Sequence, residues 1–502
     1  MKWTRSMIAL GLAVMLGFIA RSMHVKVPDS GPVRHMLLAD GALDPDRVDR
    51  IELVREGRRS VFERTPGGET SSWMQTEPVV HAADGWAVRQ LITRLMKTES
   101  VRRVEGSTVG SESAAENDEA GRKALADAGL LPPVATLVLR EEGIGGAAPR
   151  EIVVELGRRS LAGRAFARVV STATSPSDAG RVATGYDVID GALHEFALER
   201  DVRDFRRREL FPDLGDVGRV SFEAGGRRVV LVRAKSGYRL EAPVATRADR
   251  QQAEELLDAL RRARSAGFIV DDPREPSVYG LEPPAARIEI ESPPSGAKAS
   301  LPETSVVRRA IRIGDAVSIG AQDRFGLVEG TSSVVRVPAA EIAAIVPRVE
   351  RLIDAVASAV RPRDVARIEI VLGGGDSSTP TSPRERIELV REVDGWSATR
   401  VPAGEAAAPI AGRVSTEAIE RLLSALGETR AGSVEIAAFP QELSVAEVVL
   451  RGFAGEALDT VRVARREGGQ TILENGDGVL RIHGSIDLPL SIADLGFVAN
   501  TR

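Results

Sequence analysis

Three apolar stripes with the spacing of an amphipathic helix recur along the chain. Within each stripe the apolar residues stand at i, i+3, i+4 and i+7, so that they share one face of a helix. The three sets are Val88, Leu91, Ile92 and Leu95; Ala253, Leu256, Leu257 and Leu260; and Ile419, Leu422, Leu423 and Leu426. Because only one face is apolar, each helix is predicted to pack against a sheet.

Each predicted helix follows a residue that can cap its first turn. Asp84, Asp249 and Ser415 stand at the same place, seven residues before Leu91, Leu256 and Leu422. Their side-chain oxygens are suited to accept a free backbone amide of the first turn. Gln252, three residues after Asp249, also predicts a capping box in the second copy.

Upstream of each helix the apolar period changes to two, which is typical of strands. Val48-Asp-Arg-Ile-Glu-Leu53 recurs as Val217-Gly-Arg-Val-Ser-Phe222 and as Val365-Ala-Arg-Ile-Glu-Ile370. A second apolar stretch follows in each copy, and then a third that runs from an aromatic residue to a proline. These third stretches are Trp73–Pro78, Tyr238–Pro243 and Trp396–Pro402. The order strand, strand, strand, helix indicates one α+β unit that is used three times.

A second group of strands is predicted after each helix. Gly129-Leu-Leu-Pro-Pro133 and Gly280-Leu-Glu-Pro-Pro284 introduce it in the first two copies, whereas the third lacks this motif. The predicted strands contain Leu137–Leu139, Ile152–Leu156 and Phe166–Val169; Ile288–Ile290, Ile311–Ile313 and Phe325–Val328; and Val445–Leu450, Val461–Val463 and Val479–Ile482. Asn475-Gly-Asp-Gly478 predicts a hairpin turn between the last two. Short helices near Ile189–Leu198 and Ala339–Val356 are expected to close the first two units.

The fold class predicted from these patterns is α+β, with three tandem related units after one N-terminal transmembrane helix. Each unit is a small, mainly antiparallel sheet with packed amphipathic helices. The expected boundaries are 1–25 for the anchor, 26–45 for a linker, and 46–215, 216–363 and 364–502 for the units, the last divergent. Segments 106–119, 292–304 and 373–382, rich in Ser, Gly, Glu or Pro, are interpreted as exposed loops.

The N-terminus has the pattern of a membrane segment. Lys2 and Arg5 precede an uncharged run over residues 6–20, which Arg21 ends. As a helix this run is about 22 Å long, short for a hydrocarbon core of about 30 Å, but flanking basic side chains can reach the interface. A cleaved signal peptide is the alternative, although the exit from the run fits a cleavage site poorly. We expect an uncleaved, single-pass signal anchor in a bacterial cytoplasmic membrane, with the body on the extracytoplasmic (periplasmic) side.

Composition narrows the class of protein. The 502 residues are 43% hydrophobic and 28% charged, as in a folded soluble body. The net charge of −5 is spread over interspersed acidic and basic residues, which argues against a nucleic-acid surface. The chain has no cysteine, so disulfides, thiolate metal sites and a cysteine nucleophile are excluded.

No reactive group of residues is evident. The five histidines are isolated in sequence, without the spacing of metal ligands: His24, His35, His81, His194 and His483. There is no Gly-x-Ser-x-Gly motif, and the glycines at 143–146 and 373–375 do not lead into Lys-Ser/Thr. No clustered departure from the repeat stands out either. The sequence therefore predicts no enzyme, no catalytic, cofactor-binding or metal-binding residue, and no cofactor.

Some repeated polar and aromatic positions are candidate binding features. The repeated arginines Arg50, Arg219 and Arg367, called here the arginine column, could bind an anion, but strand alternation places them on the solvated side of each sheet. The repeated aromatic residues Trp73, Tyr238 and Trp396, called here the aromatic column, are expected to pack in the core rather than to form a platform for sugars. Asp271-Asp272 is only a weak candidate for a cation site, since it consists of two adjacent carboxylates.

Taken together, Val-x-Arg-Ile-x-Leu, Trp-x-x-x-x-Pro, the capped Leu-rich helix and Tyr279-Gly-Leu-Glu-Pro-Pro284 resemble the bacterial domain of unknown function 4340 family. The resemblance implies a membrane-anchored protein, often encoded beside exporter-type ABC transporters of the gliding-motility class. The expected function is a non-catalytic accessory or scaffold protein, with a transporter permease complex as partner. The alternative is an extracytoplasmic module that binds a glycan or a peptide; the sequence identifies no ligand.

Overall fold

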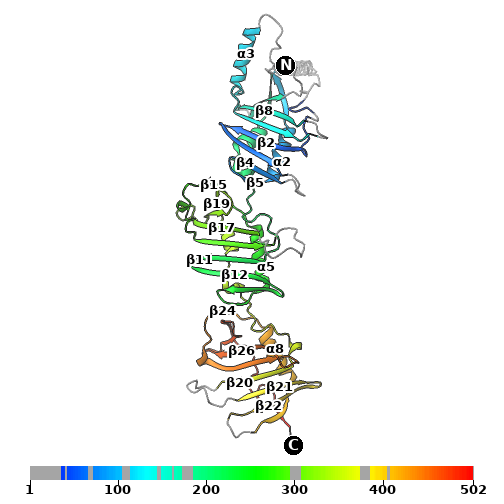
Figure 1. Cartoon of the computed structure of the whole chain (residues 1–502), viewed down its shortest axis with the longest axis vertical. Coiled ribbons are helices and arrows are strands. Elements are labelled where there is room, and N and C mark those ends of the chain that lie inside the picture. The colour runs from blue at the N-terminus through cyan, green and yellow to red at the C-terminus, as the bar shows by residue number, and fades with distance from the viewer. Residues whose placement is uncertain are drawn as a thin grey trace, which may run out of the picture. The chain divides into compact units, whose positions relative to one another are not determined.

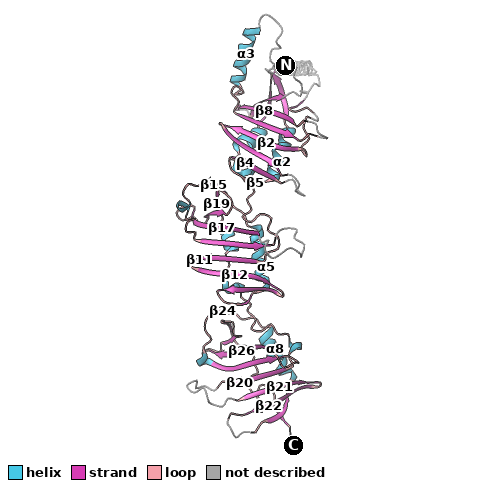
Figure 2. Ribbon diagram, viewed as in Figure 1, coloured by secondary structure: helices cyan, strands magenta, loops and turns pink. Residues whose placement is uncertain are grey.

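The chain forms three mainly antiparallel sheets, each with helices packed on it, in the computed structural model (Figures 1 and 2). The structure describes residues 35–39, 42–65, 72–104, 114–143, 148–160, 163–171, 185–293, 307–373, 385–403 and 408–500. By compactness, residues 1–207 form one unit with the first sheet, and residues 208–502 form another with the second and third sheets. The predicted α+β class is confirmed.

The first sheet has ten strands in the order β1-β6-β10-β9-β8-β7-β2-β3-β4-β5. Its strands are β1 (His35–Met36), β2 (Val48–Arg55), β3 (Arg58–Arg64), β4 (Trp73–Glu77), β5 (His81–Ala83), β6 (Glu99–Val104), β7 (Ala135–Glu141), β8 (Arg150–Arg159), β9 (Arg164–Ser171) and β10 (Tyr186–Asp190). Its helical segments are α2 (Gly85–Met96), α3 (Ala114–Asp127), α4 (Ala192–His194), the π-helical η1 (Glu195–Glu199) and the 3-10 helix η2 (Val202–Phe205).

The second sheet has nine strands in the order β14-β13-β12-β11-β16-β17-β18-β19-β15. They are β11 (Arg219–Ala224), β12 (Arg227–Ala234), β13 (Gly237–Ala242), β14 (Thr246–Arg247), β15 (Gly267–Asp271), β16 (Ala286–Ser292), β17 (Val307–Ala316), β18 (Arg324–Val328) and β19 (Ser333–Val337). The helical segments are α5 (Arg250–Arg262), η3 (Pro276–Tyr279), α6 (Ala339–Ile345) and α7 (Val349–Leu352).

The third sheet has ten strands in the order β24-β28-β27-β26-β25-β20-β21-β22-β23-β29. They are β20 (Arg367–Leu372), β21 (Arg386–Glu392), β22 (Gly395–Val401), β23 (Ile410–Val414), β24 (Ser433–Ile436), β25 (Ser444–Arg451), β26 (Ala457–Arg465), β27 (Thr471–Glu474), β28 (Val479–His483) and β29 (Val498–Ala499). The helical segments are η4 (Pro362–Asp364), α8 (Thr416–Gly427) and η5 (Gln441–Leu443).

All three sheets share one strand order. The nine-strand order of the second sheet recurs in the other two, to which β1 and β29 add one edge strand each. In every copy the strand before the helix lies toward one edge, and the strand after it (β6, β15 or β24) lies toward the opposite edge. The helix is therefore the connection across the sheet. The third sheet keeps this order although it lacks the Gly-Leu-x-Pro-Pro motif.

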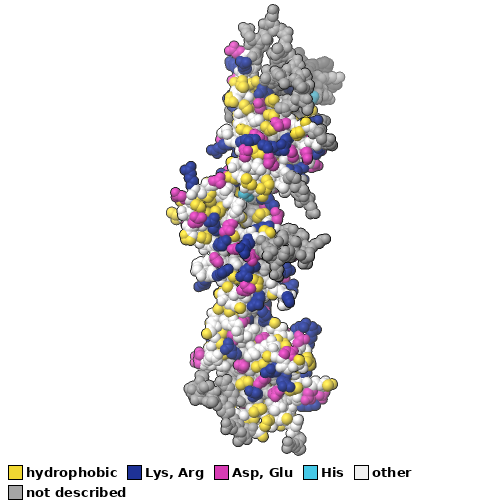
Figure 3. Space-filling model, in the orientation of Figure 1, with side chains coloured by type: hydrophobic (Ala, Val, Ile, Leu, Met, Phe, Trp, Pro, Cys, Tyr) yellow, Lys and Arg dark blue, Asp and Glu magenta, His cyan; other side chains and the backbone are white. Residues whose placement is uncertain are grey.

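The helices bury the leucines that define the repeat. Leu91, Leu256 and Leu422 expose 1%, 4% and 0% of their surface, each in the core of its own sheet. The inner strand positions of these cores are the predicted alternating apolar residues, such as Ile51 and Leu53 of β2. On the visible side of the molecule basic and acidic side chains are interspersed over the sheets (Figure 3). The predicted helix faces are confirmed.

The caps agree with the prediction in two of the three helices. The Asp84 carboxylate accepts hydrogen bonds from Trp86 N and Ala87 N, and Asp249 accepts one from Gln252 N. Ser415 lies at the expected place, but its side chain makes no capping hydrogen bond, so this part of the prediction is wrong. The capping box is also wrong, because Asp249 N, which the Gln252 side-chain oxygen would have to accept from, donates to Leu352 O at 2.8 Å instead.

The Gly-Leu-x-Pro-Pro segments form the same corner in the first and second sheets. Gly129 and Gly280 have φ angles of +70° and +64°, in the left-handed region that favours glycine. Opposite them, a Cβ at Gly157 or Gly314 would lie 2.3 Å or 2.0 Å from a backbone carbonyl oxygen. Both corners therefore require a pair of glycines, one for its dihedral angles and one for the close approach.

The structure differs from the sequence prediction in several segments. Helix α3 begins inside segment 106–119, which was interpreted as a loop. The short helix expected near Ile189–Leu198 is confirmed as the contiguous α4 and η1, which follow strand β10, whereas the helix expected to close the second unit is divided into α6 and α7. Strand β27 was missed. The expected linker contributes Leu37, Leu38 and Leu43 to the first core.

The expected anchor, residues 1–25, lies outside the described residues. Among those that the structure describes, no helix is both long enough and apolar enough to cross a membrane.

Replacement of Leu260 by Ala is expected to lower the free energy of unfolding by about 2–5 kcal/mol, because its side chain is fully buried and would leave a cavity. The matched control is Ile319→Ala in the loop after β17, where the side chain is fully exposed and the expected change is within about 0.5 kcal/mol. Denaturant unfolding of the purified proteins measures both. Equal effects of the two substitutions would contradict the helix assignment.

Candidate functional site

A polar cleft of about 1080 Å³ lies within the unit of residues 208–502. One wall comes from β13, β14 and the start of α5 in the second sheet. The other comes from the third sheet, and residues of the connection between the two sheets, such as Asp354, also line the cleft. The polar residues that line it include Tyr238, Arg239, Thr246, Arg247, Asp249, Arg250, Gln251, Glu254, Asp354, Arg430, Asp459, Asn475 and Asp477.

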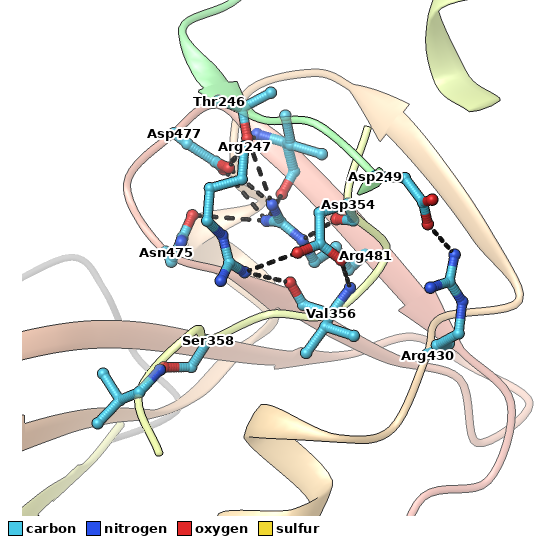
Figure 4. Close-up of polar contacts among 12 residues, drawn as sticks. Thr246, Arg247, Asp249, Asp354, Val356, Ser358, Arg430, Asn475, Asp477 and Arg481 are labelled. Atoms are coloured by element: carbon cyan, nitrogen blue, oxygen red, sulfur yellow. Dashed lines mark hydrogen bonds and ion pairs between the residues drawn. The ribbon is translucent and has the colours of Figure 1, made fainter. Parts of the chain in front are cut away.

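Arg481 of β28 contacts residues from both sides of the cleft, Thr246 and Asp477 among them (Figure 4). Its guanidinium group is fully buried and donates to the Asp477 carboxylate at 2.7 Å and to the Asp354 carbonyl oxygen at 3.0 Å. The Thr246 hydroxyl, from β14 of the second sheet, donates to the same Asp477 carboxylate. A buried cation is stable only when it is paired and hydrogen-bonded, and these contacts from both sheets supply that pairing.

Arg481 occupies a position that is apolar in the second sheet. By strand pairing, Arg481 lies opposite Val434 of β24 as Val335 lies opposite Phe268 of β15. Val335 is a buried core residue of the second sheet. Arg481, with Asp477 in the preceding turn, is thus a departure from the repeat. The sequence pattern did not reveal it, and its contacts join two sheets.

The connecting segment is fixed to both walls by backbone hydrogen bonds. Asp354 N donates to Arg247 O at 3.0 Å, and Ala431 N donates to Ala355 O at 3.0 Å. The Arg247 side chain donates to Val356 O at 2.8 Å and lies 3.5 Å from the Asp354 carboxylate. The outer edge of β14 is therefore occupied by the protein's own chain.

Asp249 combines a helix cap with an ion pair between the sheets. Its side chain is almost fully buried and contacts the Arg430 guanidinium of the third sheet. Burial by itself raises the pKa of this carboxyl, but the hydrogen bond from Gln252 N and the ion pair with Arg430 outweigh burial and hold the pKa below its ordinary value. Asp249 is thus a fixed anion near neutral pH and a poor proton acceptor.

Two side chains of opposite charge in the lining lack a charged partner among the described residues. Asp459 accepts hydrogen bonds from the Ser358 hydroxyl at 2.7 Å and from Thr460 N at 2.9 Å, but contacts no arginine or lysine there. Arg239 of β13 is exposed and makes no described hydrogen bond or ion pair. Tyr238, next to it, is only partly buried. These three side chains remain available to a ligand.

The arginine column lies on the solvated sheet faces, as predicted. Each arginine pairs with a glutamate at 2.6–3.1 Å and remains partly exposed: Arg50 with Glu63, Arg219 with Glu241, and Arg367 with Glu388. Pairs of this kind contribute little to stability and leave no free cation in the column.

The aromatic column is divided by the structure. Trp73 and Trp396 expose only 3% and 6% of their surface and belong to the cores, as predicted. Tyr238 packs only partly on its core and also lines the cleft, so the prediction was incomplete at this position. The lack of a tryptophan in this one copy was the available signal.

The histidines do not come together in the described residues. His35 is exposed, and His483 is buried in β28. A ring nitrogen of His81 is hydrogen-bonded to Ala82 O, and one of His194 is hydrogen-bonded to Gly157 O. Asp271 accepts a hydrogen bond from Ser333 Oγ at 2.7 Å. No set of three or more His, Asp or Glu side chains is arranged to hold a metal within the described ranges. His24 and the glycines 145–146 and 374–375 lie outside those ranges.

Comparison with known proteins gives one match. A family model described as "Domain of unknown function (DUF4340)" matches residues 188–284 and 239–446, a span that includes the second sheet and much of the third. No curated protein and no solved structure shows a significant match.

Replacement of Arg481 by Met is expected to lower the free energy of unfolding by roughly 3–5 kcal/mol, because it leaves the largely buried Asp477 carboxylate without its cation. Arg308→Met is the matched control: its side chain is exposed and its partners Glu289 and Glu291 are partly exposed, and we expect a change below about 1 kcal/mol. Denaturant unfolding monitored by circular dichroism distinguishes the two. A loss for Arg481→Met no larger than the control's would contradict the role of this contact.

Acidification is expected to destabilise the third sheet through His483. Burial, reinforced by the positive charge of Arg481, lowers the pKa of His483, and its Nε2 has no partner among the described residues. The unfolded chain therefore takes up this proton first, so stability is complete above about pH 6.5 and declines as the pH falls toward the folded-state pKa. His483→Gln should flatten the decline of the unfolding free energy below about pH 6.5. An unchanged slope in His483→Gln would be evidence against the linkage.

Proposed function

The chain belongs to the domain of unknown function 4340 family, and from this premise we propose that it is a non-catalytic accessory or scaffold protein of the bacterial cell envelope. It is held in the cytoplasmic membrane by residues 1–25, and its body acts by contact on the extracytoplasmic side. The partner is an exporter-type ABC transporter of the gliding-motility class, as the family resemblance implies.

The observation that supports this proposal is that the carboxylates in the cleft are held by ion pairs and hydrogen bonds. Asp249, Asp354 and Asp477 are each paired with an arginine, and Asp459 is held by a hydroxyl and a backbone amide. General acid–base catalysis needs a group that exchanges a proton near the working pH. The lowered pKa of Asp249 is the opposite adjustment. These groups are suited to hold a shape and to offer hydrogen bonds.

The repeated architecture also favours contact as the mode of action. Three copies of one sheet present strand faces on which arginines and glutamates alternate, for example Arg50, Glu52 and Glu63 in the first. Rows of alternating charge give specificity and orientation to a protein contact more than raw affinity. Such faces suit a scaffold that meets a partner of complementary charge pattern.

The second candidate function is an extracytoplasmic binding module. One specific observation favours it: Tyr238 packs only partly on the core of its sheet and lines the polar cleft, whereas Trp73 and Trp396 are buried in the cores of theirs. A binding module and a scaffold are compatible, because the cleft occupies only one part of the unit of residues 208–502.

Affinity purification of the tagged full-length chain from detergent-solubilised membranes tests the first proposal. We expect the permease and ATPase subunits of one ABC exporter to be enriched, as identified by mass spectrometry. The matched control is a chain without residues 1–25, which should move to the soluble fraction with an unchanged circular dichroism spectrum and lose the enrichment. Full-length protein that is membrane-bound but recovers no transporter subunit would refute the transporter assignment, and a truncated chain that stays with the membrane would refute the anchor.

A further inference from the structure

The charges that line the cleft are nearly balanced. Four arginines and five carboxylates face it, and the buried Arg481 adds a fifth cation against Asp477. Most are paired with one another, as in Arg250 with Glu254 at 2.9 Å. A strongly anionic or cationic ligand would have to break these pairs. The electrostatics of the lining therefore favour a ligand without net charge.

The free hydrogen-bonding groups are of both kinds and come from both walls. Arg239 on β13 offers donors, whereas Asp459 on β26 offers acceptors and lacks a cation. Gln251 on α5 adds a side-chain amide, whose nitrogen donates to Glu255 at 2.8 Å and whose oxygen is free to accept. A ligand that matches this set must both donate and accept at several points, as neighbouring hydroxyl groups do.

Among the described residues that line the cleft, Tyr238 alone is aromatic. Its ring is partly buried against the second core, which fixes its position, and its remaining surface faces the cleft. An aromatic ring with a polar tip suits a ligand that has an apolar face and a polar rim. A pyranose ring has this character.

Peptides and lipids fit the cleft less well. An extended peptide would gain most by adding a strand, but the edge at β14 is taken by residues 353–355, through the Ala248–Ile353 bridge and the hydrogen bond from Asp354 N to Arg247 O. The apolar lining consists of four alanines, one valine and one leucine. It offers no deep pocket for large apolar side chains or an acyl chain.

We propose that the cleft between the second and third sheets binds an uncharged oligosaccharide, with Tyr238 against a sugar ring and Arg239, Gln251 and Asp459 on its hydroxyl groups. Its volume of about 1080 Å³ slightly exceeds the range of about 300–1,000 Å³ typical of small-molecule sites, which leaves space for more than one ring. The site is independent of the transporter contact, because it requires only residues of this chain.

Isothermal titration calorimetry on purified, detergent-solubilised full-length protein tests this site. The probes are maltotriose, cellotriose and tri-N-acetylchitotriose, each at up to about 10 mM. We expect at least one to bind with a Kd between about 10 µM and 1 mM. Raising NaCl from about 50 to 300 mM should change the Kd less than about twofold, since the lining has little net charge to screen.

Substitutions in the cleft test whether the oligosaccharide binds there. Tyr238→Ala should weaken it about tenfold, whereas Tyr238→Phe keeps the ring and should stay within about twofold of the wild type. Arg308→Gln, on an exposed pair outside the cleft, should have no effect. Arg239→Gln, at an exposed position where the fold is not at risk, should weaken binding about threefold and keeps the test valid if Tyr238→Ala does not fold.

Three results would overturn the proposal: no binding by any of the trisaccharides, equal binding by the wild type and Tyr238→Ala, or binding of trialanine in their place. None of them bears on recovery of transporter subunits, so failure here is distinct from failure of the scaffold proposal.

Discussion

The constraint on which this structure depends is that one amphipathic helix must connect opposite edges of each sheet. The strand before α2, α5 or α8 lies toward one edge, and the strand after it lies toward the other. The helix therefore has to cross the sheet, and only an apolar stripe as long as the helix can be buried along that path. This explains why the four stripe positions are the best preserved feature among the three copies. The strand order follows from the same crossing.

Much of the fold could be predicted because its determinants are local. The period of the apolar residues shows which face of a helix or strand is buried, and Leu91, Leu256 and Leu422 are buried as that period requires. Prediction failed where tertiary contacts decide the outcome. Whether Ser415 caps α8 depends on how the chain enters the helix, and there its backbone N donates to Leu495 O. Strand β27 is short and buried at every position, so it has no alternation to detect.

The cleft could not be predicted, because its contacts join residues that are far apart in the sequence. Thr246 meets Asp477, and Asp249 meets Arg430, across more than 180 residues in each case. The turn at Asn475–Gly478 was recognisable, but nothing in its sequence indicates that Asp477 pairs with an arginine at a core position. Alignment of the copies strand by strand, rather than by motif, would place Arg481 opposite Val335 and mark the exception.

That exception links architecture to the proposed binding site. A cation in place of a core valine is costly unless its charge is paired and its donors are hydrogen-bonded, and Asp477, Thr246 of the second sheet and the Asp354 carbonyl of the connecting segment do this. The same contacts fix the two walls that carry Arg239 and Asp459. A ligand that bonds to both walls binds only when the two sheets are associated. Its binding therefore stabilises that association. The polar contacts that join the sheets thus also preorganise the cleft, and preorganisation reduces the entropic cost of binding a flexible oligosaccharide.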